Sequence, residues 1–348
     1  MKKYISFLLV GFVFFLISCS NDDITISRNI TFKVNPSGVV KSFTEEVVPG
    51  ELTSLNSGCK LRVKILAYDK DGLLAYCDSA FLDSYSSQMT SQKYMPEGTY
   101  TVIAVTDVVR GSISNISREY WNMSGMNDIN TLKVSYTHWL AFNNVILGVA
   151  SQKVTIDEHS QDIILNPSPA GALFLIVYYN ISRFSDVESY KLLTNRSCDY
   201  MSFDSNGNIE TVIENQNNQF NWRTSIINVG NETSDNIYDY AYVFPMDNSS
   251  YKFVARIKGN TEDTDLIDKN IVIPSIKAGE EHYFELDLKN FTYNYSKVSN
   301  GNSRTRSLNS VLTSTPWLEK KKMNSQETIM LKDLIRNQEN VLNKQNEF

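Results

Sequence analysis

Short apolar runs, each ended by Gly, Pro, Asp or Asn, follow one another along most of this 348-residue chain. The run at 61–67 alternates apolar with mostly charged residues, which is the pattern of a strand with one face in water. The β-branched run at 99–106 predicts a central strand, and the continuous apolar run at 173–179 predicts a strand buried on both faces. The pattern as a whole favours an all-β fold.

Two turn sequences share one form, which is an aromatic residue, Asp, any residue, Asp or Asn, and Gly. They are Tyr68-Asp69-Lys70-Asp71-Gly72 and Phe203-Asp204-Ser205-Asn206-Gly207. Each predicts a hairpin, because Gly accepts the positive φ of a tight turn. A calcium loop fits less well, since its Gly stands sixth and here it stands fourth. The repeat indicates either two copies of one sandwich or two common hairpin turns.

The cysteines Cys59, Cys77 and Cys198 are interpreted as small buried hydrophobic residues. A hairpin that turns at 69–72 places Cys77 near Lys64 or Leu66 and Cys59 several residues further away. We therefore expect no disulfide between Cys59 and Cys77.

The same patterns predict further strands in both halves. They cover residues 145–149, 152–156, 162–165, 199–203, 209–213, 240–244, 251–257, 270–273 and 282–288. The region 108–126 has no clear period and is interpreted as a long loop or a short helix.

The domain organisation follows from the breaks between these segments. Two prolines within 166–169 cannot continue a central strand and mark a boundary. The apolar stripe at 318–342 predicts an amphipathic helix, which either packs on the body or binds a partner. We expect a signal peptide at 1–18, a lipidated linker with a candidate first strand at 19–30, sandwiches at 31–166 and 167–290, and a polar linker with the helix at 291–348.

The N-terminus has a basic start at Met1-Lys2-Lys3 and an apolar run at 5–17, the pattern of a secretory signal. Leu16-Ile17-Ser18-Cys19 resembles the bacterial lipobox, which implies lipidation of Cys19. Ser20 argues against retention at the inner membrane, and Asp22-Asp23 resembles the export signal of surface lipoproteins. We therefore expect a lipid-anchored protein on the outer membrane at the cell surface.

The sequence contains no recognisable catalytic pattern, so we do not expect an enzyme. Net charge is −6 with no basic cluster in the body, so nucleic acid is not expected as a partner. His138, His159 and His282 lie far apart, and no ligand spacing predicts a metal. No Gly-x-Ser-x-Gly elbow or phosphate-binding Gly-rich loop is present, so no catalytic residue and no cofactor are predicted. Carboxylates gathered around His138 or His159 would change that view.

Several aromatic residues keep a glycan as a candidate ligand. Tyr120, Trp121, Trp139 and Trp222 could form a sugar-stacking platform, although Trp in a β-protein more often lies in the core. The alternative function is therefore a surface glycan-binding lipoprotein of a polysaccharide uptake system. Asp78-Ser79-Ala80 also resembles a short O-glycosylation site, with Ser79 as the acceptor.

Taken in order, these features resemble the fimbrillin-like lipoproteins of Bacteroidetes, especially the anchor subunits of type V fimbriae. The resemblance covers 19–288 and rests on the lipobox, the Pro-Glu-Gly-Thr-Tyr-Thr-Val run at 96–102, Leu147-Gly148 and the Pro-bearing junction. It implies two transthyretin-like β-sandwiches in tandem and binding of neighbouring fimbrial subunits by β-strand addition.

The resemblance also implies a candidate processing site. In related shaft subunits an Arg-specific protease removes the first strand, and a neighbour's strand fills the groove. Arg28 is the matching candidate here, or else simply a solvated arginine. The helical tail departs from the family pattern and puts in doubt whether a C-terminal strand is available for donation.

Overall fold

The computed structural model describes residues 27–298, apart from 42, 44–54, 56, 113–114, 138–145, 160, 182–185, 197, 199, 213–221, 229–235, 268 and 290–291. The predicted signal peptide, Cys19 and the predicted helix at 318–342 lie outside these residues. The described part is nearly all β, as predicted, with one short helix, α2 (Ser37–Lys41). None of its helices has the length and apolar character that crossing a membrane requires.

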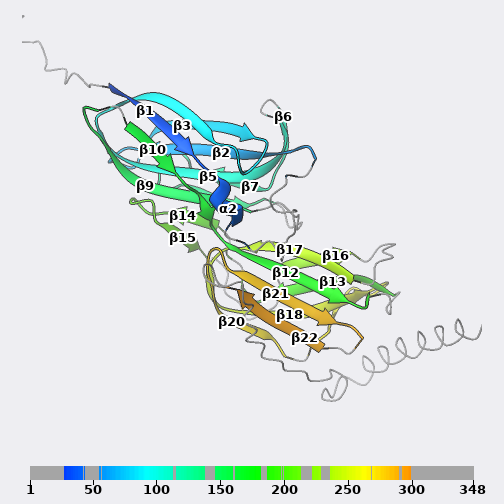
Figure 1. Ribbon diagram of the computed structural model, residues 1–348. Helices are drawn as coiled ribbons and strands as arrows, with labels where there is room; N and C mark the ends of the chain where they lie inside the picture. The colour runs from blue at the N-terminus through cyan, green and yellow to red at the C-terminus, as the bar shows by residue number, and fades with distance from the viewer. Residues whose placement is uncertain are drawn as a thin grey trace, which may run out of the picture.

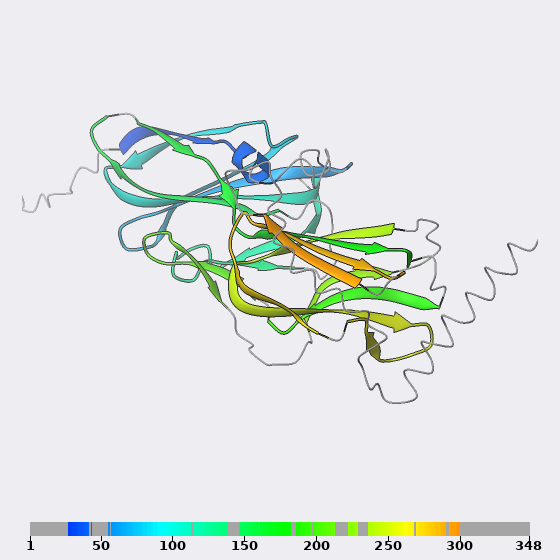
Figure 2. The same ribbon diagram turned by 60° about the horizontal axis from the view of Figure 1, so that its bottom comes forward.

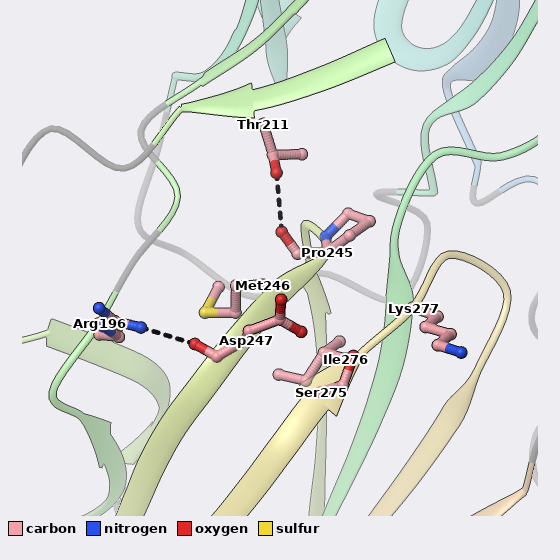
Figure 3. A pocket seen from close by; sticks show the side chains of 8 residues that line it. All are labelled: Arg196, Thr211, Pro245, Met246, Asp247, Ser275, Ile276 and Lys277. Atoms are coloured by element: carbon pink, nitrogen blue, oxygen red, sulfur yellow. Dashed lines mark hydrogen bonds between the residues drawn. The ribbon is translucent and has the colours of Figure 1, made fainter. Parts of the chain in front are cut away.

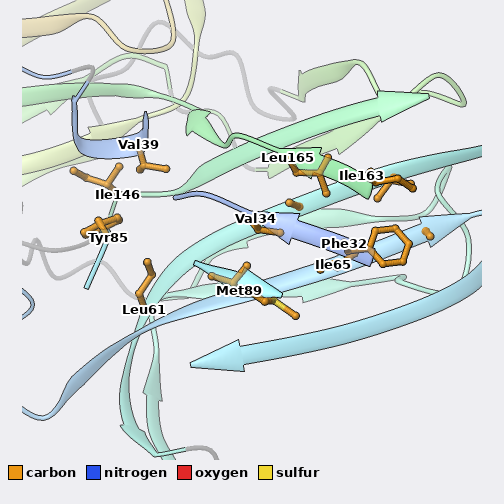
Figure 4. Close-up of a cluster of buried hydrophobic side chains, with 14 of the residues drawn as sticks. Phe32, Val34, Val39, Leu61, Ile65, Tyr85, Met89, Ile146, Ile163 and Leu165 are labelled. Atoms are coloured by element: carbon orange, nitrogen blue, oxygen red, sulfur yellow. The ribbon is translucent and has the colours of Figure 1, made fainter. Parts of the chain in front are cut away.

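Two sheets face each other in the N-terminal half. The β1 sheet has the order β10 (Gln161–Leu165), β1 (Ser27–Val34), β4 (Met89–Pro96). The β5 sheet has the order β11 (Ser168–Pro169), β9 (Gly148–Ile156), β5 (Gly98–Ser112), β2 (Cys59–Tyr68), β3 (Leu74–Leu82), with β6 (Asn115–Glu119) also paired to β5. Side chains from both sheets, such as Phe32 and Ile65, form one buried core (Figure 4).

Two more sheets face each other in the C-terminal half. The β12 sheet has the order β17 (Asn236–Val243), β12 (Ala172–Tyr179), β21 (Glu281–Asp287), β22 (Thr292–Val298). The β13 sheet has the order β16 (Trp222–Asn228), β13 (Val187–Thr194), β18 (Met246–Ile257), β19 (Asp263–Asp265), with β20 (Ile271–Ile276) also paired to β18. Phe174, Tyr251 and Phe284 pack ring against ring between them.

A fifth sheet joins the two halves, and we call it the shared sheet. Its order is β15 (Ile209–Val212), β14 (Tyr200–Phe203), β8 (Lys133–Tyr136), β7 (Trp121–Ser124). Strands β7 and β8 precede the predicted boundary at 166–169, and β14 and β15 follow it. The hairpin β14–β15 therefore lies between the halves, which Figures 1 and 2 show from two sides. A third core contains residues of both halves, including Leu66, Ile103 and Met201.

Several local predictions are confirmed. Both predicted hairpins form, with positive φ at Gly72 (82°) and Gly207 (80°). Strand β5 lies between β9 and β2, and β12 is buried on most of both faces. Cys77 pairs with Leu66 in the register, and Cys59 and Cys77 are both free thiols.

Other predictions are corrected. Cys77 is exposed, because residues 75, 77 and 79 of β3 point away from the core at the end of the sheet. Region 108–126 is neither loop nor helix but contains the end of β5, β6 and β7, and its short strands lack a clean alternation of buried and exposed side chains. Residues 292–298, placed in the polar linker, form β22, because its Tyr293 and Tyr295 pack against the C-terminal core.

Candidate functional site

Strand β1 is the first described segment, yet it lies in the middle of its sheet. It pairs antiparallel with β4 along all eight residues, and parallel with β10 from Ile30 to Val34. Neither neighbour adjoins it in sequence, since residues 35–88 separate it from β4. Figure 1 shows β1 beside β10 in the upper half of the molecule. A groove between β4 and β10 is therefore filled by a strand that no tight turn holds in place.

The core-facing side of β1 fills this groove with apolar side chains. Ile30, Phe32 and Val34 alternate along the strand and are each 0% exposed. They pack in the core that also contains Ile163 and Leu165 of β10 (Figure 4). Full burial of each such side chain contributes about 1.5–3 kcal/mol. Every second side chain of β1 from Ile30 to Val34 is therefore buried in this core.

The outward side of β1 carries two ion pairs. Arg28 Nε lies 2.8 Å from Glu97 Oε1, and Lys33 Nζ lies 2.6 Å from Asp162 Oδ2. All four side chains are more than a quarter exposed, so each pair contributes little to the free energy of folding. The two pairs are compatible with the register of β1 against β4 and β10, while the buried apolar face supplies most of the stabilisation.

The C-terminal end of β1 is held by polar contacts. The Asn35 backbone N–H donates to the Leu165 carbonyl oxygen at 2.9 Å. The Asn35 side chain donates to Asn166 Oδ1 at 3.0 Å and accepts from Gln88 Nε2 at 2.5 Å. The end of β1 nearer α2 is therefore tied to both flanking segments.

The structure places two of the predicted modification sites on strands. Arg28 is the second residue of β1, so cleavage after it would leave Asn29–Val34 within the sheet. Ser79 is exposed on β3. Cys19 lies outside the described residues. The three predicted sites are therefore not brought together, and Arg28 cleavage alone would not empty the groove.

The proposed aromatic platform loses two members, because Tyr120 is only 5% exposed and Trp121 is buried in the same core. Trp121 is 1% exposed and packs against Tyr136, Tyr242 and Phe244, with ring centroids 5.1, 5.9 and 5.2 Å away. Trp139 and the side chain of Trp222 are not among the parts of the chain that the structure describes. Trp121 is thus a core residue of the shared sheet and does not offer a ring to a sugar.

The two histidines in the described part of the chain are not grouped. His159 is exposed, His282 is 0% exposed, and His138 falls outside the described residues. Within the described ranges, no three His, Cys, Asp or Glu side chains lie close enough to hold a metal ion.

Sequence reasoning missed a buried polar cluster at the β21–β22 edge of the β12 sheet. Glu280 lies 3.0 Å from Lys297 Nζ and 3.3 Å from His282 Nε2, and it accepts the Lys277 backbone N–H at 2.9 Å. Burial alone raises the pKa of Glu280, but these contacts outweigh it and lower the pKa to about 2. Burial lowers the pKa of His282, which Glu280 opposes. The residues are spread over 277–297, so no local motif marks them.

A hollow of about 410 Å³ opens where β15 meets β18 and β20 (Figure 3). Arg196 and Lys277 stand on opposite sides of it, with Asp247 and Met246 between them. Arg196 Nη1 donates to the Asp247 carbonyl oxygen at 2.7 Å. The lining includes the hydroxyl groups of Thr211 and Ser275 but no histidine or cysteine.

Comparison with known proteins gives no family assignment. No family model and no curated protein matches the chain. Solved structures that align with it include Bacteroidetes fimbrial anchor and assembly proteins at low sequence identity.

Three of the solved structures that align with the chain show how their descriptions differ. A Bacteroides thetaiotaomicron protein provisionally described as polysaccharide-binding aligns over 78% of this chain and 95% of its own, with 10% identity and a TM-score of 0.46. The fimbrial anchor protein Mfa2 of Porphyromonas gingivalis aligns over 78% and 97%, with 14% identity and a TM-score of 0.40. A fimbrial assembly protein of Parabacteroides distasonis aligns over 78% and 96%, with 11% identity and a TM-score of 0.38.

Proposed function

We propose that this chain is a lipid-anchored fimbrial subunit of the cell surface, with an anchor or assembly role, that binds neighbouring subunits by β-strand addition. The observation that carries the proposal is the position of β1 between β4 and β10. A segment that fills a groove with alternate apolar side chains, and that no hairpin holds there, can be replaced by a similar strand of another chain.

The lipid belongs to the same proposal. Lipidation of Cys19 would attach the chain to the outer membrane eight residues before β1 begins at Ser27. The body would then lie close to the membrane, with the groove-filling strand nearest to it. The transthyretin-like topology of the two halves is also part of the proposal.

The first test is co-purification from outer membranes of the native host in mild detergent, with Cys19→Ala as the control. High-mass, heat-resistant ladders that contain other β-rich subunits are expected for the native chain. Cys19→Ala should lose the membrane association. A monomer alone would contradict the fimbrial role, and recovery with a transporter and polysaccharide would move the assignment to glycan capture.

The second test locks β1 in place. Thr31 and Gln92 oppose each other on β1 and β4 and both face outward, so a Thr31→Cys, Gln92→Cys pair has the spacing of a disulfide. The oxidised double variant should give no ladders, and reduction should restore them. Thr31→Cys alone is the control. Ladders that persist when the lock is closed would show that exchange of β1 is not the mode of binding.

Cleavage after Arg28 remains a separate prediction. Because Arg28 follows Cys19, such cleavage would also release the body from its lipid. The mass of the mature chain and of an Arg28→Ala variant checks it. The mass of Ser79-containing peptides checks O-glycosylation in the same experiment.

A further inference from the structure

Strand β3 has a long unpaired edge. The Leu74 N–H donates to the Asn127 carbonyl oxygen at 3.0 Å, but beyond Leu74 β3 pairs with β2 alone within the described residues. Its nine residues exceed those of the other edge strands, such as β4 and β17 with eight each. An edge of this length presents backbone N–H and C=O groups to any strand that approaches. The side chains of Ala75, Cys77 and Ser79 on the solvent face of β3 are small and exposed.

The register fixes which backbone groups point outward. The Gly111 N–H donates to the Gly58 carbonyl oxygen, so Gly58 faces β5. Backbone direction alternates along a strand, so Lys64 also faces β5 and turns away from β3. Ser79 opposes Lys64, and its N–H therefore points to the open edge near the middle of β3.

That N–H is already occupied. It donates to Oδ1 of Asp78 at 2.8 Å. The carboxylate thus uses the central donor of the open edge and places a negative charge where an incoming carbonyl oxygen would have to lie.

Asp78 is itself held in position from two strands. Its Oδ2 accepts the Tyr76 hydroxyl at 3.1 Å and the Ser91 hydroxyl, and those two hydroxyl oxygens lie 2.6 Å apart. Phe32 of β1 stacks on the Tyr76 ring at 5.4 Å. The network spans the seam between β3 and β4, where the β5 sheet and the β1 sheet meet.

We propose that Asp78 closes the β3 edge to strand addition, and that the partner it excludes is the same edge of a second copy of this chain. When two copies pair antiparallel about the middle of β3, the two Asp78 carboxylates approach each other, and like charges on opposed strands destabilise such a pair. Inward-pointing charged residues protect edge strands in the same way. The proposal does not depend on the fimbrial role, because it concerns self-association of the purified chain.

The test measures the mass of the full chain by light scattering over a range of concentrations. Cys19→Ser removes the lipid, and the Thr31→Cys, Gln92→Cys lock keeps exchange of β1 from contributing. In this background the chain should be a monomer, and Asp78→Ala should form dimers or larger species. Asp157→Ala, which removes an exposed aspartate from the segment after β9, is the matched control and should stay monomeric.

A rescue variant separates the β3 edge from other surfaces. Asp78→Ala with Ser79→Pro removes the outward N–H, which the β2 ladder does not use, so the monomer should return. A folded Asp78→Ala that stays monomeric overturns the proposal, as does association that survives the proline.

Hydrogen exchange tests the hydrogen bond between the Ser79 N–H and the Asp78 carboxylate without a substitution. The Ser79 amide should exchange at least tenfold more slowly than the outward amides of Cys77 and Phe81. Equal rates at the three positions would overturn the proposal.

Discussion

Glu280 illustrates how single buried ionisable residues set the pH response of this molecule. Its folded pKa of about 2 lies below the ordinary 4.5, and the pKa of His282 lies below the ordinary 6.5. A lowered pKa means that the unfolded chain binds more protons, so both groups stabilise the fold at neutral pH. His282 loses that contribution as the pH falls below 6.5, and Glu280 as it falls from 4.5 towards 2.

We predict that Glu280→Gln lowers the free energy of unfolding at pH 7 by about 1–3 kcal/mol, because it removes hydrogen bonds to a charged group. Urea unfolding at several pH values checks this. The variant should also lose part of the decline between pH 4.5 and 2. Glu158→Gln, at an exposed glutamate, is the control. An unchanged acid profile in Glu280→Gln would contradict the assignment.

Arg62 forms a buried ion pair with Asp107 that contributes to stability. It is 5% exposed, and its Nε and Nη2 each lie 2.8 Å from an oxygen of Asp107, while Nη1 lies 2.5 Å from Glu119. Burial raises the pKa of Asp107 to about 6, and Arg62 opposes that rise. Arg62→Met should cost about 3–5 kcal/mol in urea unfolding, because it leaves the Asp107 carboxylate buried and uncompensated.

A double variant checks this interpretation. Arg62→Met with Asp107→Leu should recover most of the loss, since well-packed apolar residues often replace a buried ion pair without cost. If the double variant is no more stable than the single one, burial of the carboxylate is not the cause.

At the scale of the elements, the β14–β15 hairpin touches the other half through its turn. A Cβ on Gly207 would meet Thr101 Cγ2 at 2.8 Å and would also collide with Ser151. Thr101 Oγ1 donates to the Ser205 carbonyl oxygen at 3.3 Å. The turn therefore packs on β5 and β9 of the N-terminal half.

Gly207→Ala should destabilise the protein by about 2–4 kcal/mol in urea unfolding, from left-handed strain of about 1–2 kcal/mol plus the collision. Gly259→Ala is a matched control, because Gly259 has φ 85° but nothing within 4 Å of the added Cβ. Equal losses at the two positions would mean that the turn does not press on the N-terminal half.

Elements were predictable from the sequence where the signal is local. The Gly72 and Gly207 turns, the doubly buried β12 and the pairing of Cys77 with Leu66 all follow from residues close in sequence. The centre position of β1 and the pairing of β8 with β14 were not predictable, because each joins segments more than 50 residues apart. In β6 and β7 apolar and polar residues do not alternate regularly, so the sequence pattern did not predict strands there.

At the scale of the whole molecule, the shared sheet makes the two halves depend on each other. Met201 of β14 is 0% exposed and lies in the core that also contains Leu66 and Ile103 of the β5 sheet. Lys133 of β8 lies 4.1 Å above the ring of Tyr200 of β14. We therefore expect one cooperative unfolding transition by calorimetry.

Met201→Ala should split that transition in two, because its loss of about 2–5 kcal/mol falls on the contact between the halves. Met246→Ala, in the core of the C-terminal half, should lower the transition temperature without splitting it. Two transitions in the unaltered chain would contradict the coupling.

The central position of β1 also governs how the molecule bears tension. If the lipid is at Cys19, a pull on the far side of the body enters through Ser27 and runs along the axis of β1. The hydrogen bonds to β4 and β10 lie across that axis on both flanks, so they are loaded together in shear and not unzipped one at a time. Single-molecule pulling from residue 19 should therefore need a higher rupture force than pulling from the edge strand β15. The strand that another chain would replace in the proposed strand addition would then also be the strand that best resists a mechanical pull.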